Sequence, residues 1–142
     1  MNKSVLITGS EGYLGSVLVP FLINKGFKVT GIDTCFFNEY ELIDKNINNK
    51  NYKFIKLDVR DIDESYLKGI DVVVHLAGIS NDPMCKMDAA TVYDPTRIYS
   101  KKLAALCKSK NIRFIFASSC SVYGLGNNDL LDELSNVNPQ TG

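Results

Sequence analysis

Three glycines spaced three residues apart stand near the start of this chain, in the run TGSEGYLG at Thr8–Gly15. The residues before them, Ser4–Ile7, form a short apolar run typical of a strand buried on both faces of a parallel sheet. After the glycine run, apolar residues recur at helical spacing, namely Leu14, Val17, Leu18, Phe21 and Leu22. The glycines are therefore expected on a turn between a strand and a helix. The N–H groups and dipole of a helix N-terminus favour phosphate at such a place.

A second strand and an acid follow this turn. The helix is expected to end near Lys25, with Gly26 as its cap, and a strand is expected at Phe27–Ile32. Asp33 comes next, 18 residues after Gly15. A carboxylate about 20 residues beyond the turn binds an adenosine ribose and disfavours a 2′-phosphate. Glycines also mark ordinary turns. The order of strand, turn, helix, strand and acid nevertheless favours a dinucleotide site, with NAD preferred over NADP.

Length and composition predict one domain, residues 1–142, large enough for a hydrophobic core. The 16 Lys and Arg residues balance 16 Asp and Glu residues, which argues against nucleic acid or an anionic membrane as a partner. The sequence shows neither a signal-peptide pattern nor an apolar run of membrane-spanning length, so a cytoplasmic location is expected. The four cysteines are scattered without metal-ligand spacing, so reduced thiols and no metal site are expected.

Strand and helix patterns alternate along the whole chain. Further strands are expected at Tyr52–Leu57, Asp71–Leu76 and Arg113–Ala117, separated by a short helix around Ile62–Lys68 and a longer one through Ile98–Cys107. This alternation predicts an α/β fold, a Rossmann-type doubly wound parallel sheet of about five strands with flanking helices. Right-handed crossovers would bring the carboxyl ends of all the strands to one edge, where ligands bind in such sheets.

Several residues that follow the strands are expected at that edge. Asp58 is either the cap of a helix or a hydrogen-bond partner of an adenine edge. His75 ends an apolar strand and is expected to be a core residue with satisfied hydrogen bonds rather than a catalyst. Ala77 and Gly78 are small, which leaves room for a wide, flat cofactor.

The segment Ser118–Tyr123 has three interpretations. Its serines satisfy backbone groups of a turn, form a nucleophile elbow, or offer a hydroxyl to a substrate oxygen beside a nicotinamide ring. The nucleophile elbow is disfavoured because Ser119 is not flanked by glycines and no histidine other than His75 is available as its base.

Together these segments resemble the extended short-chain dehydrogenase/reductase family, in particular its NAD-dependent nucleotide-sugar epimerases and dehydratases. The matching motifs occur in the family's order: TGSEGYLG at 8–15, Asp33, DVR at 58–60, HLAG at 75–78 and SSCSVYG at 118–124. The resemblance implies NAD as cofactor. The residues that would hold its pyrophosphate and ribose are Gly9, Gly12, Tyr13, Leu14, Gly15 and Asp33. Those that would flank the adenine or line the path to the nicotinamide are Asp58, Val59, Leu76, Ala77, Gly78 and Ser80.

The resemblance also implies catalytic positions. Ser119 matches the family's active-site Ser/Thr, which hydrogen-bonds the reacting sugar hydroxyl. Cys120 and Ser121 stand where the dehydratases carry an acid pair, which disfavours 4,6-dehydration. Cys120 resembles the acid/base cysteine of certain epimerase-reductases, although a single cysteine is more often inert. Thr96 stands where the family often has an asparagine. The family's catalytic tyrosine and lysine, in a YxxxK helix, and its substrate domain would follow Gly142, so the Rossmann domain is expected to be truncated here.

These implications lead to one leading functional hypothesis and two alternatives. The leading one is the NAD-binding portion of a nucleotide-sugar epimerase or reductase, which transfers a hydride between a sugar ring carbon and NAD. The alternatives are a free-standing NAD-binding module or partner subunit without activity of its own, and a remnant prone to aggregation through an exposed sheet edge. The expected substrate is a nucleotide sugar of unspecified base, and a homodimer is one possible assembly.

Overall fold

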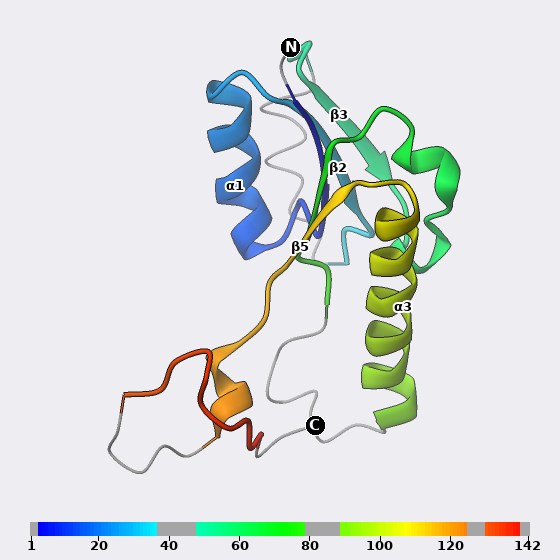
Figure 1. Cartoon of the computed structure of the whole chain (residues 1–142). Coiled ribbons are helices and arrows are strands. Elements are labelled where there is room, and N and C mark those ends of the chain that lie inside the picture. The colour runs from blue at the N-terminus through cyan, green and yellow to red at the C-terminus, as the bar shows by residue number, and fades with distance from the viewer. Residues whose placement is uncertain (1–2, 37–47, 79–88, 125–129, 140–142) are drawn as a thin grey trace.

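One parallel sheet organises the chain. The computed structural model describes residues 3–36, 48–78, 89–124 and 130–139, and the side chains of residues 89–95 are not described. The sheet has five strands in the order β3-β2-β1-β4-β5, and every neighbouring pair is parallel (Figure 1). The strands are β1 (Ser4–Thr8), β2 (Lys28–Asp33), β3 (Tyr52–Lys56), β4 (Val72–His75) and β5 (Arg113–Phe116). The predicted doubly wound fold is confirmed.

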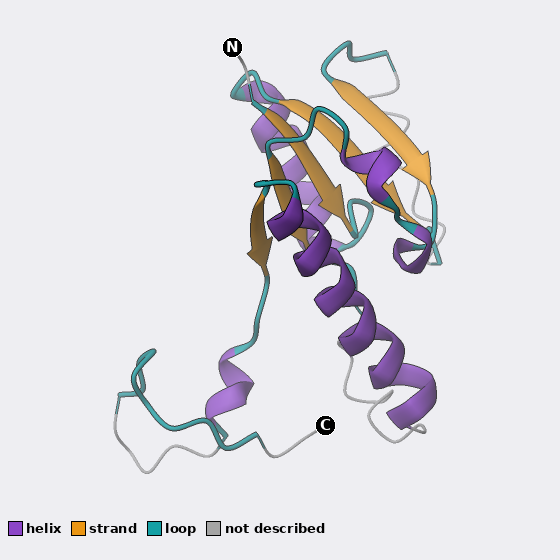
Figure 2. Cartoon of the chain, turned by 45° about the vertical axis from the view of Figure 1, so that its right-hand side comes forward, coloured by secondary structure: helices purple, strands orange, loops and turns teal. Residues whose placement is uncertain are grey.

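Helices cover the two faces of this sheet. The helix α1 (Tyr13–Asn24) lies on one face, and α3 (Ala89–Ser109) lies on the other (Figures 1 and 2). Two short 3₁₀ helices, η1 (Val59–Asp61) and η2 (Glu64–Leu67), are on the α3 side, and a third, η4 (Cys120–Tyr123), follows β5. None of the helices in the described ranges is long and apolar enough to cross a membrane.

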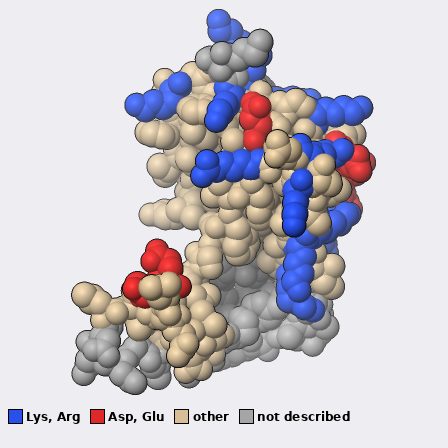
Figure 3. Space-filling view, viewed as in Figure 1, with Lys and Arg blue, Asp and Glu red and all other residues tan. Residues whose placement is uncertain are grey.

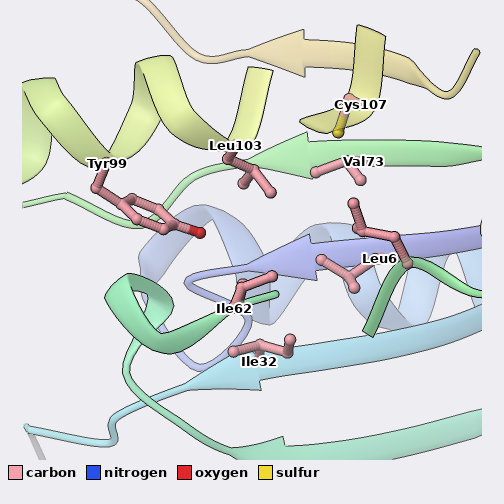
Figure 4. Close-up of a cluster of buried hydrophobic side chains, with 8 residues drawn as sticks. Leu6, Ile32, Ile62, Val73, Tyr99, Leu103 and Cys107 are labelled. Atoms are coloured by element: carbon pink, nitrogen blue, oxygen red, sulfur yellow. The ribbon is translucent and has the colours of Figure 1, made fainter. Parts of the chain in front are cut away.

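The core consists of two clusters separated by the sheet, because successive side chains of a strand point to opposite faces. In the central strand β1, Val5 and Ile7 contact the α1 side, where Val19 and Ile23 of that helix are buried. Leu6 points to the α3 side. Figure 4 shows that cluster, which includes Leu6, Ile32, Ile62, Val73, Tyr99, Leu103 and Cys107. A strand buried on both faces explains why the first apolar run of the sequence does not alternate.

The helix α1 ends with the glycine cap that the sequence predicted. Gly26 has φ +84°, a left-handed conformation that favours glycine. Its amide donates to the carbonyl of Ile23 over 2.9 Å, and the Phe27 amide donates to the carbonyl of Leu22 over 3.0 Å. These two bonds form a Schellman motif, which stops the helix and turns the chain into β2.

The connection between β3 and β4 differs from the prediction. A single short helix was expected around Ile62–Lys68, but the structure has the two 3₁₀ turns η1 and η2. Each turn begins with an aspartate whose side chain accepts a backbone amide two residues later: Asp58 from Arg60 and Asp63 from Ser65. Such Asx bonds compete with a continuous α-helix, so the chain turns twice and buries Ile62 and Leu67.

Basic residues are unevenly placed on the surface. Figure 3 shows Lys and Arg side chains gathered at the end of the molecule where the N-terminus lies, and beside α3. Four lysines, Lys28, Lys50, Lys53 and Lys68, line a cleft at the amino ends of the strands. The opposite, carboxyl edge of the sheet carries the predicted site residues, so this basic surface is not part of that site.

Candidate functional site

The glycine turn joins β1 to α1 at the carboxyl edge of the sheet. Gly9 has φ +75°, and its amide donates to the carbonyl of Ile32 in β2 over 2.8 Å. A methyl group on Gly9 would lie 2.8 Å from the backbone nitrogen of Ala77, which follows β4. A methyl group on Gly15 would overlap carbonyl oxygens of the turn itself. Both positions therefore need glycine, Gly9 for the turn and Gly15 for the close approach of helix and turn.

The first turn of α1 presents backbone amides without a cap. Gly12 is the N-cap residue, makes no side-chain hydrogen bond, and is followed by no acidic residue in the first turn. The Ser16 amide makes the first backbone bond of the helix, to the Gly12 carbonyl over 2.8 Å. The amides of Tyr13, Leu14 and Gly15 precede it, and no described residue caps them. A methyl group on Gly12 would meet only one atom, 3.4 Å away, so the approach from outside is open. This helix N-terminus suits a phosphate.

Asp33 lies beside the glycine turn, at the end of β2. Its Oδ2 accepts the amide of Glu11 over 3.0 Å, and its Oδ1 accepts the amide of Cys35 over 2.7 Å. These bonds fix the carboxylate at the expected position, and each oxygen retains a lone pair that a ribose hydroxyl can use. The predicted contact with ribose remains a prediction.

Asp58 caps η1, in agreement with one of its two predicted roles. Its carboxylate accepts the Arg60 amide over 2.8 Å and forms an ion pair with the Arg60 guanidinium over 2.6 Å. The hydrogen bonds from Arg60 hold the pKa of Asp58 below its usual value. Val59, its neighbour, is partly buried against the core on the α3 side. Contact of these two residues with adenine remains a prediction.

His75 is a buried residue with both ring nitrogens paired, as expected. Its Nδ1 is 2.6 Å from Oγ1 of Thr8, and its Nε2 is 2.9 Å from Oγ of Ser100 in α3. Burial lowers the pKa of His75 to about 4, so the imidazole is neutral near pH 7.

The turn after β4 is hydrogen-bonded to the end of the neighbouring strand β1. The Leu76 amide donates to the Thr8 carbonyl over 3.0 Å, and the Ala77 amide donates to Thr8 Oγ1 over 3.3 Å. A methyl group on Gly78 would lie 3.6 Å from the Thr96 methyl group, an ordinary contact distance. Ala77 therefore lies beside the glycine turn, and the predicted role of Ala77 and Gly78 in leaving room for a cofactor remains a prediction. Ser80 is outside the described residues.

Ser119 and Cys120 lie at the start of η4 and are exposed. Ser119 Oγ accepts the Ser121 amide over 3.2 Å and is 2.8 Å from Ser121 Oγ, so it caps the turn. Cys120 is a free thiol, as are the other cysteines in the described part of the chain, Cys35 and Cys107. The structure brings together the glycine turn, Asp33 and Ala77. It places η4 apart from them, beyond the end of β5 (Figures 1 and 2).

One contact of the glycine turn was missed by the sequence analysis. The Tyr52 hydroxyl in β3 donates to Oε1 of Glu11 over 3.3 Å. The pKa of Tyr52 is raised, mainly by its burial and to a smaller extent by the charge of Glu11. A methyl group on Gly31 would lie 2.7 Å from Ser10 Oγ and 2.8 Å from the Tyr52 hydroxyl. Gly31 therefore makes room for this polar group. A glycine inside a strand was the available signal, because it often marks such a close approach.

Comparison with known proteins agrees with this geometry. The strand order, with the glycine turn at the point where it reverses, defines the chain as a Rossmann-type α/β domain. A model of the NAD dependent epimerase/dehydratase family matches residues 5–142. The chain belongs to this family, so the resemblance noted in the sequence is confirmed. Among its described residues, no group of three His, Cys, Asp or Glu could hold a metal ion.

Three relatives of similar sequence are named as epimerases or decarboxylases of nucleotide sugars. A UDP-N-acetylglucosamine 4-epimerase from Methanobrevibacter ruminantium M1, in complex with UDP-N-acetylmuramic acid, is 37% identical with a TM-score of 0.89, over 99% of this chain and 45% of that one. A UDP-glucuronic acid 4-epimerase from Bacillus cereus, in complex with NAD, is 28% identical with a TM-score of 0.83, over 96% and 46%. A UDP-glucuronic acid decarboxylase 1 from Danio rerio is 29% identical over 87% of this chain and 29% of its own length. The chain spans less than half the length of these relatives.

Proposed function

We propose that this chain is the NAD-binding portion of an enzyme that transfers a hydride between a ring carbon of a nucleotide sugar and NAD. The observation that carries the proposal is the uncapped first turn of α1, which lies between Gly9 and Asp33 at the switch point of the sheet. Ligands bind at this place in doubly wound folds, and a phosphate is the ligand that a helix N-terminus favours. The family and the NAD and nucleotide sugars in related structures support the same assignment.

The residues at the switch point fit NAD. The amides of Tyr13–Gly15 and the open side of Gly12 would bind the pyrophosphate, and Asp33 would bind the adenosine ribose. Because the Asp33 carboxylate would repel a 2′-phosphate, the site should prefer NAD to NADP. When bound, NAD supplies a nicotinamide ring that can accept a hydride and return it. Leu76, Ala77 and Gly78 would line the path to that ring, together with Ser80, and Asp58 and Val59 would flank the adenine.

The substrate contacts are assigned by the sequence pattern. The Ser119 hydroxyl would donate to or accept from the sugar hydroxyl whose carbon loses the hydride, which orients that hydroxyl. The Cys120 thiol, exposed beside it, is the alternative group for proton transfer. Because η4 lies apart from the glycine turn in the structure, both roles require the segment after β5 to approach the nicotinamide end of the sheet edge.

Calorimetric titration of the chain with NAD, and separately with NADP, tests the cofactor assignment. We expect saturable binding of NAD and binding of NADP at least about tenfold weaker. A tenfold difference in affinity needs only about 1.4 kcal/mol of repulsion between the Asp33 carboxylate and the 2′-phosphate of NADP. Circular dichroism at the same concentration shows that the protein is folded. A folded chain that releases no heat with NAD would contradict the proposal.

Incubation with NAD and a UDP-sugar tests the hydride transfer, in a protein that carries this NAD-binding portion together with the YxxxK helix and substrate domain that the resemblance implies. UDP-N-acetylglucosamine and UDP-glucuronic acid are the probes, and the near-ultraviolet absorbance of NADH is the signal. We expect S119A to reduce this signal at least tenfold and to leave the affinity for NAD unchanged, because Ser119 would contact only the sugar. S135A removes a half-buried serine hydroxyl of the C-terminal segment, one that bonds Asp132, and should change neither quantity. Equal NADH signals in S119A and S135A would remove Ser119 from the site.

A further inference from the structure

A chain of four hydrogen bonds connects α3 to the glycine turn through His75, the one histidine of the sequence. Ser100 Oγ donates to the Thr96 carbonyl over 2.8 Å, and His75 Nε2 is 2.9 Å from Ser100 Oγ. His75 Nδ1 is 2.6 Å from Thr8 Oγ1, and the Ala77 amide donates to Thr8 Oγ1 over 3.3 Å. This series of hydrogen bonds therefore begins inside α3 and ends at Ala77, beside the glycine turn.

The donors and acceptors of this chain fix the tautomer of the imidazole. A serine hydroxyl has one proton, and that of Ser100 is used on the Thr96 carbonyl. His75 Nε2 must then be the donor to Ser100, and Nδ1 must be the acceptor from the Thr8 hydroxyl. Because the Thr8 hydroxyl donates its hydrogen bond to Nδ1, the lone pairs of Thr8 Oγ1 are available to the Ala77 amide. All four bonds then run in one direction.

These hydrogen bonds lie at the switch point of the sheet. Thr8 and His75 are paired in register at the carboxyl ends of β1 and β4, the two strands between which the strand order reverses. Directly beyond them, Gly9 is so close to Ala77 that no side chain fits between them. The Thr8–His75 bond thus joins the two walls of the crevice immediately below the candidate cofactor site.

The surroundings of His75 keep it neutral and oriented. Its side chain is buried, with Tyr99 of α3 packed edge-on at 5.5 Å between ring centroids and with Phe114 and Phe116 of β5 at 5.9 and 5.8 Å. Tyr99 is the titratable side chain among these neighbours, and burial raises its pKa, so it is uncharged at neutral pH. Thr8 of β1 and Ser100 of α3 are uncharged as well. These neighbours of the ring therefore supply neither a proton nor a counter-charge.

We propose that His75 is a positioning residue for the cofactor: as a neutral imidazole with its proton on Nε2, it fixes the Ala77 amide through Thr8 and so sets the width of the crevice between the glycine turn and Leu76–Gly78. The proposal rests on the proposed NAD site and adds to it a buried group that touches neither cofactor nor substrate. The same chain links the N-terminal half of α3 to the crevice, so a change at Ser100 reaches the site through His75.

Nitrogen NMR of the single histidine tests the tautomer without any ligand. We expect the signals of a neutral ring with the proton on Nε2 in the wild-type chain at pH 7. In S100A the acceptor for that proton is lost, and we expect the fraction with the proton on Nδ1 to increase. A wild-type ring with its proton on Nδ1, or a charged ring at pH 7, would overturn the proposal.

Titration with NAD tests the positioning role. T8V has nearly the shape of threonine but lacks the hydroxyl, so we expect its affinity for NAD to fall about tenfold, or about 1.4 kcal/mol. T8S keeps the hydroxyl and should restore binding to within about threefold of wild type, or about 0.6 kcal/mol. S100A should weaken binding about threefold. S109A is its matched control, because Ser109 Oγ bonds a carbonyl of the same helix away from the site, and it should leave the affinity unchanged.

The outcomes separate this proposal from the proposed function. A folded wild-type chain that does not bind NAD refutes the proposed function, and the positioning role with it. A wild-type chain that binds NAD as tightly as folded T8V and S100A refutes the positioning role alone. If T8V does not fold, the comparison of S100A with S109A decides, because each removes one serine hydroxyl from the same helix.

Discussion

At the scale of single residues, Gly12 and Gly15 lie in the same turn and have different surroundings. A methyl group on Gly15 would overlap backbone oxygens, whereas one on Gly12 would meet a single oxygen at 3.4 Å and otherwise point outward. We therefore predict that G15A lowers the free energy of unfolding by about 2 kcal/mol, as overpacking of backbone does. G12A should change stability by less than about 0.5 kcal/mol, and it should weaken NAD binding about tenfold because the methyl group occupies the approach to the amides.

Denaturant unfolding and NAD titration of both variants check this pair. A G12A protein that binds NAD as tightly as wild type would show that the pyrophosphate lies elsewhere. A G15A protein of wild-type stability would show that α1 can move away from the turn without cost.

The charge of Asp33 leads to a second prediction. D33N keeps one acceptor oxygen, but its side-chain NH2 group then faces the backbone N–H of either Glu11 or Cys35, and two donors cannot bond each other. We expect the affinity for NAD to fall about tenfold and the preference for NAD over NADP to decrease by a similar factor, each about 1.4 kcal/mol. D63N is the control, since Asp63 makes the same kind of bond to the Ser65 amide in η2, away from the glycine turn. An unchanged preference in D33N would exclude Asp33 from the ribose site.

The sequence predicted these residues because their signals are local. The spacing of Gly9, Gly12 and Gly15 and the position of Asp33 after the second strand depend only on neighbouring elements. The bond between Thr8 and His75 could not be predicted, because it depends on the register of two strands whose paired residues are 67 positions apart. The same reason hid the contact of Glu11 with Tyr52, which are 41 positions apart.

At the scale of elements, strands were easier to predict than the connection between β3 and β4. Buried parallel strands leave continuous apolar runs, and the glycine cap marks the end of α1. The connection contains apolar residues at nearly helical spacing, and these suggested one helix. Asp58 and Asp63 nevertheless bond backbone amides two residues later, which divides the segment into η1 and η2. Competition between a side chain and the helical backbone decides such cases, and spacing alone does not reveal it.

The packing of α3 on the sheet leads to a prediction of pH dependence. The pKa of His75 is about 4 in the folded chain, against about 6.5 in an unfolded one. Between these values the unfolded state binds more protons, so the free energy of unfolding falls as the pH is lowered from about 6.5 to 4. The loss should approach roughly 3 kcal/mol, because each tenfold difference in proton affinity between the two states corresponds to about 1.4 kcal/mol.

Denaturant unfolding at several pH values between 4 and 7 measures this dependence. H75Q removes the imidazole and should flatten the slope in that range, while the carboxylates of both proteins titrate alike at lower pH. Equal slopes in wild type and H75Q would show that folding does not lower the pKa of His75.

At the scale of the whole molecule, charge and exposed apolar surface act together. The formal net charge is zero, so little electrostatic repulsion keeps two copies of the chain apart. The strand β5 lies at one edge of the described sheet, and its Ile115 side chain is 43% exposed. On α1, Leu14, Val17 and Phe21 are more than half exposed. A sheet edge with exposed apolar side chains is a template for pairing with another strand.

We therefore predict that the 142-residue chain self-associates reversibly as its concentration rises, and that I115K reduces the association. The lysine places a charge on the β5 edge and adds one unit to the net charge. L134K adds the same charge at a residue that is 93% exposed on the C-terminal segment, outside the sheet. Sedimentation velocity over a range of concentrations measures both variants. If L134K dissociates the protein as effectively as I115K, net charge rather than the β5 edge governs association. If the wild-type chain is monomeric throughout, neither the edge nor the apolar face of α1 is sufficient to bring two copies together.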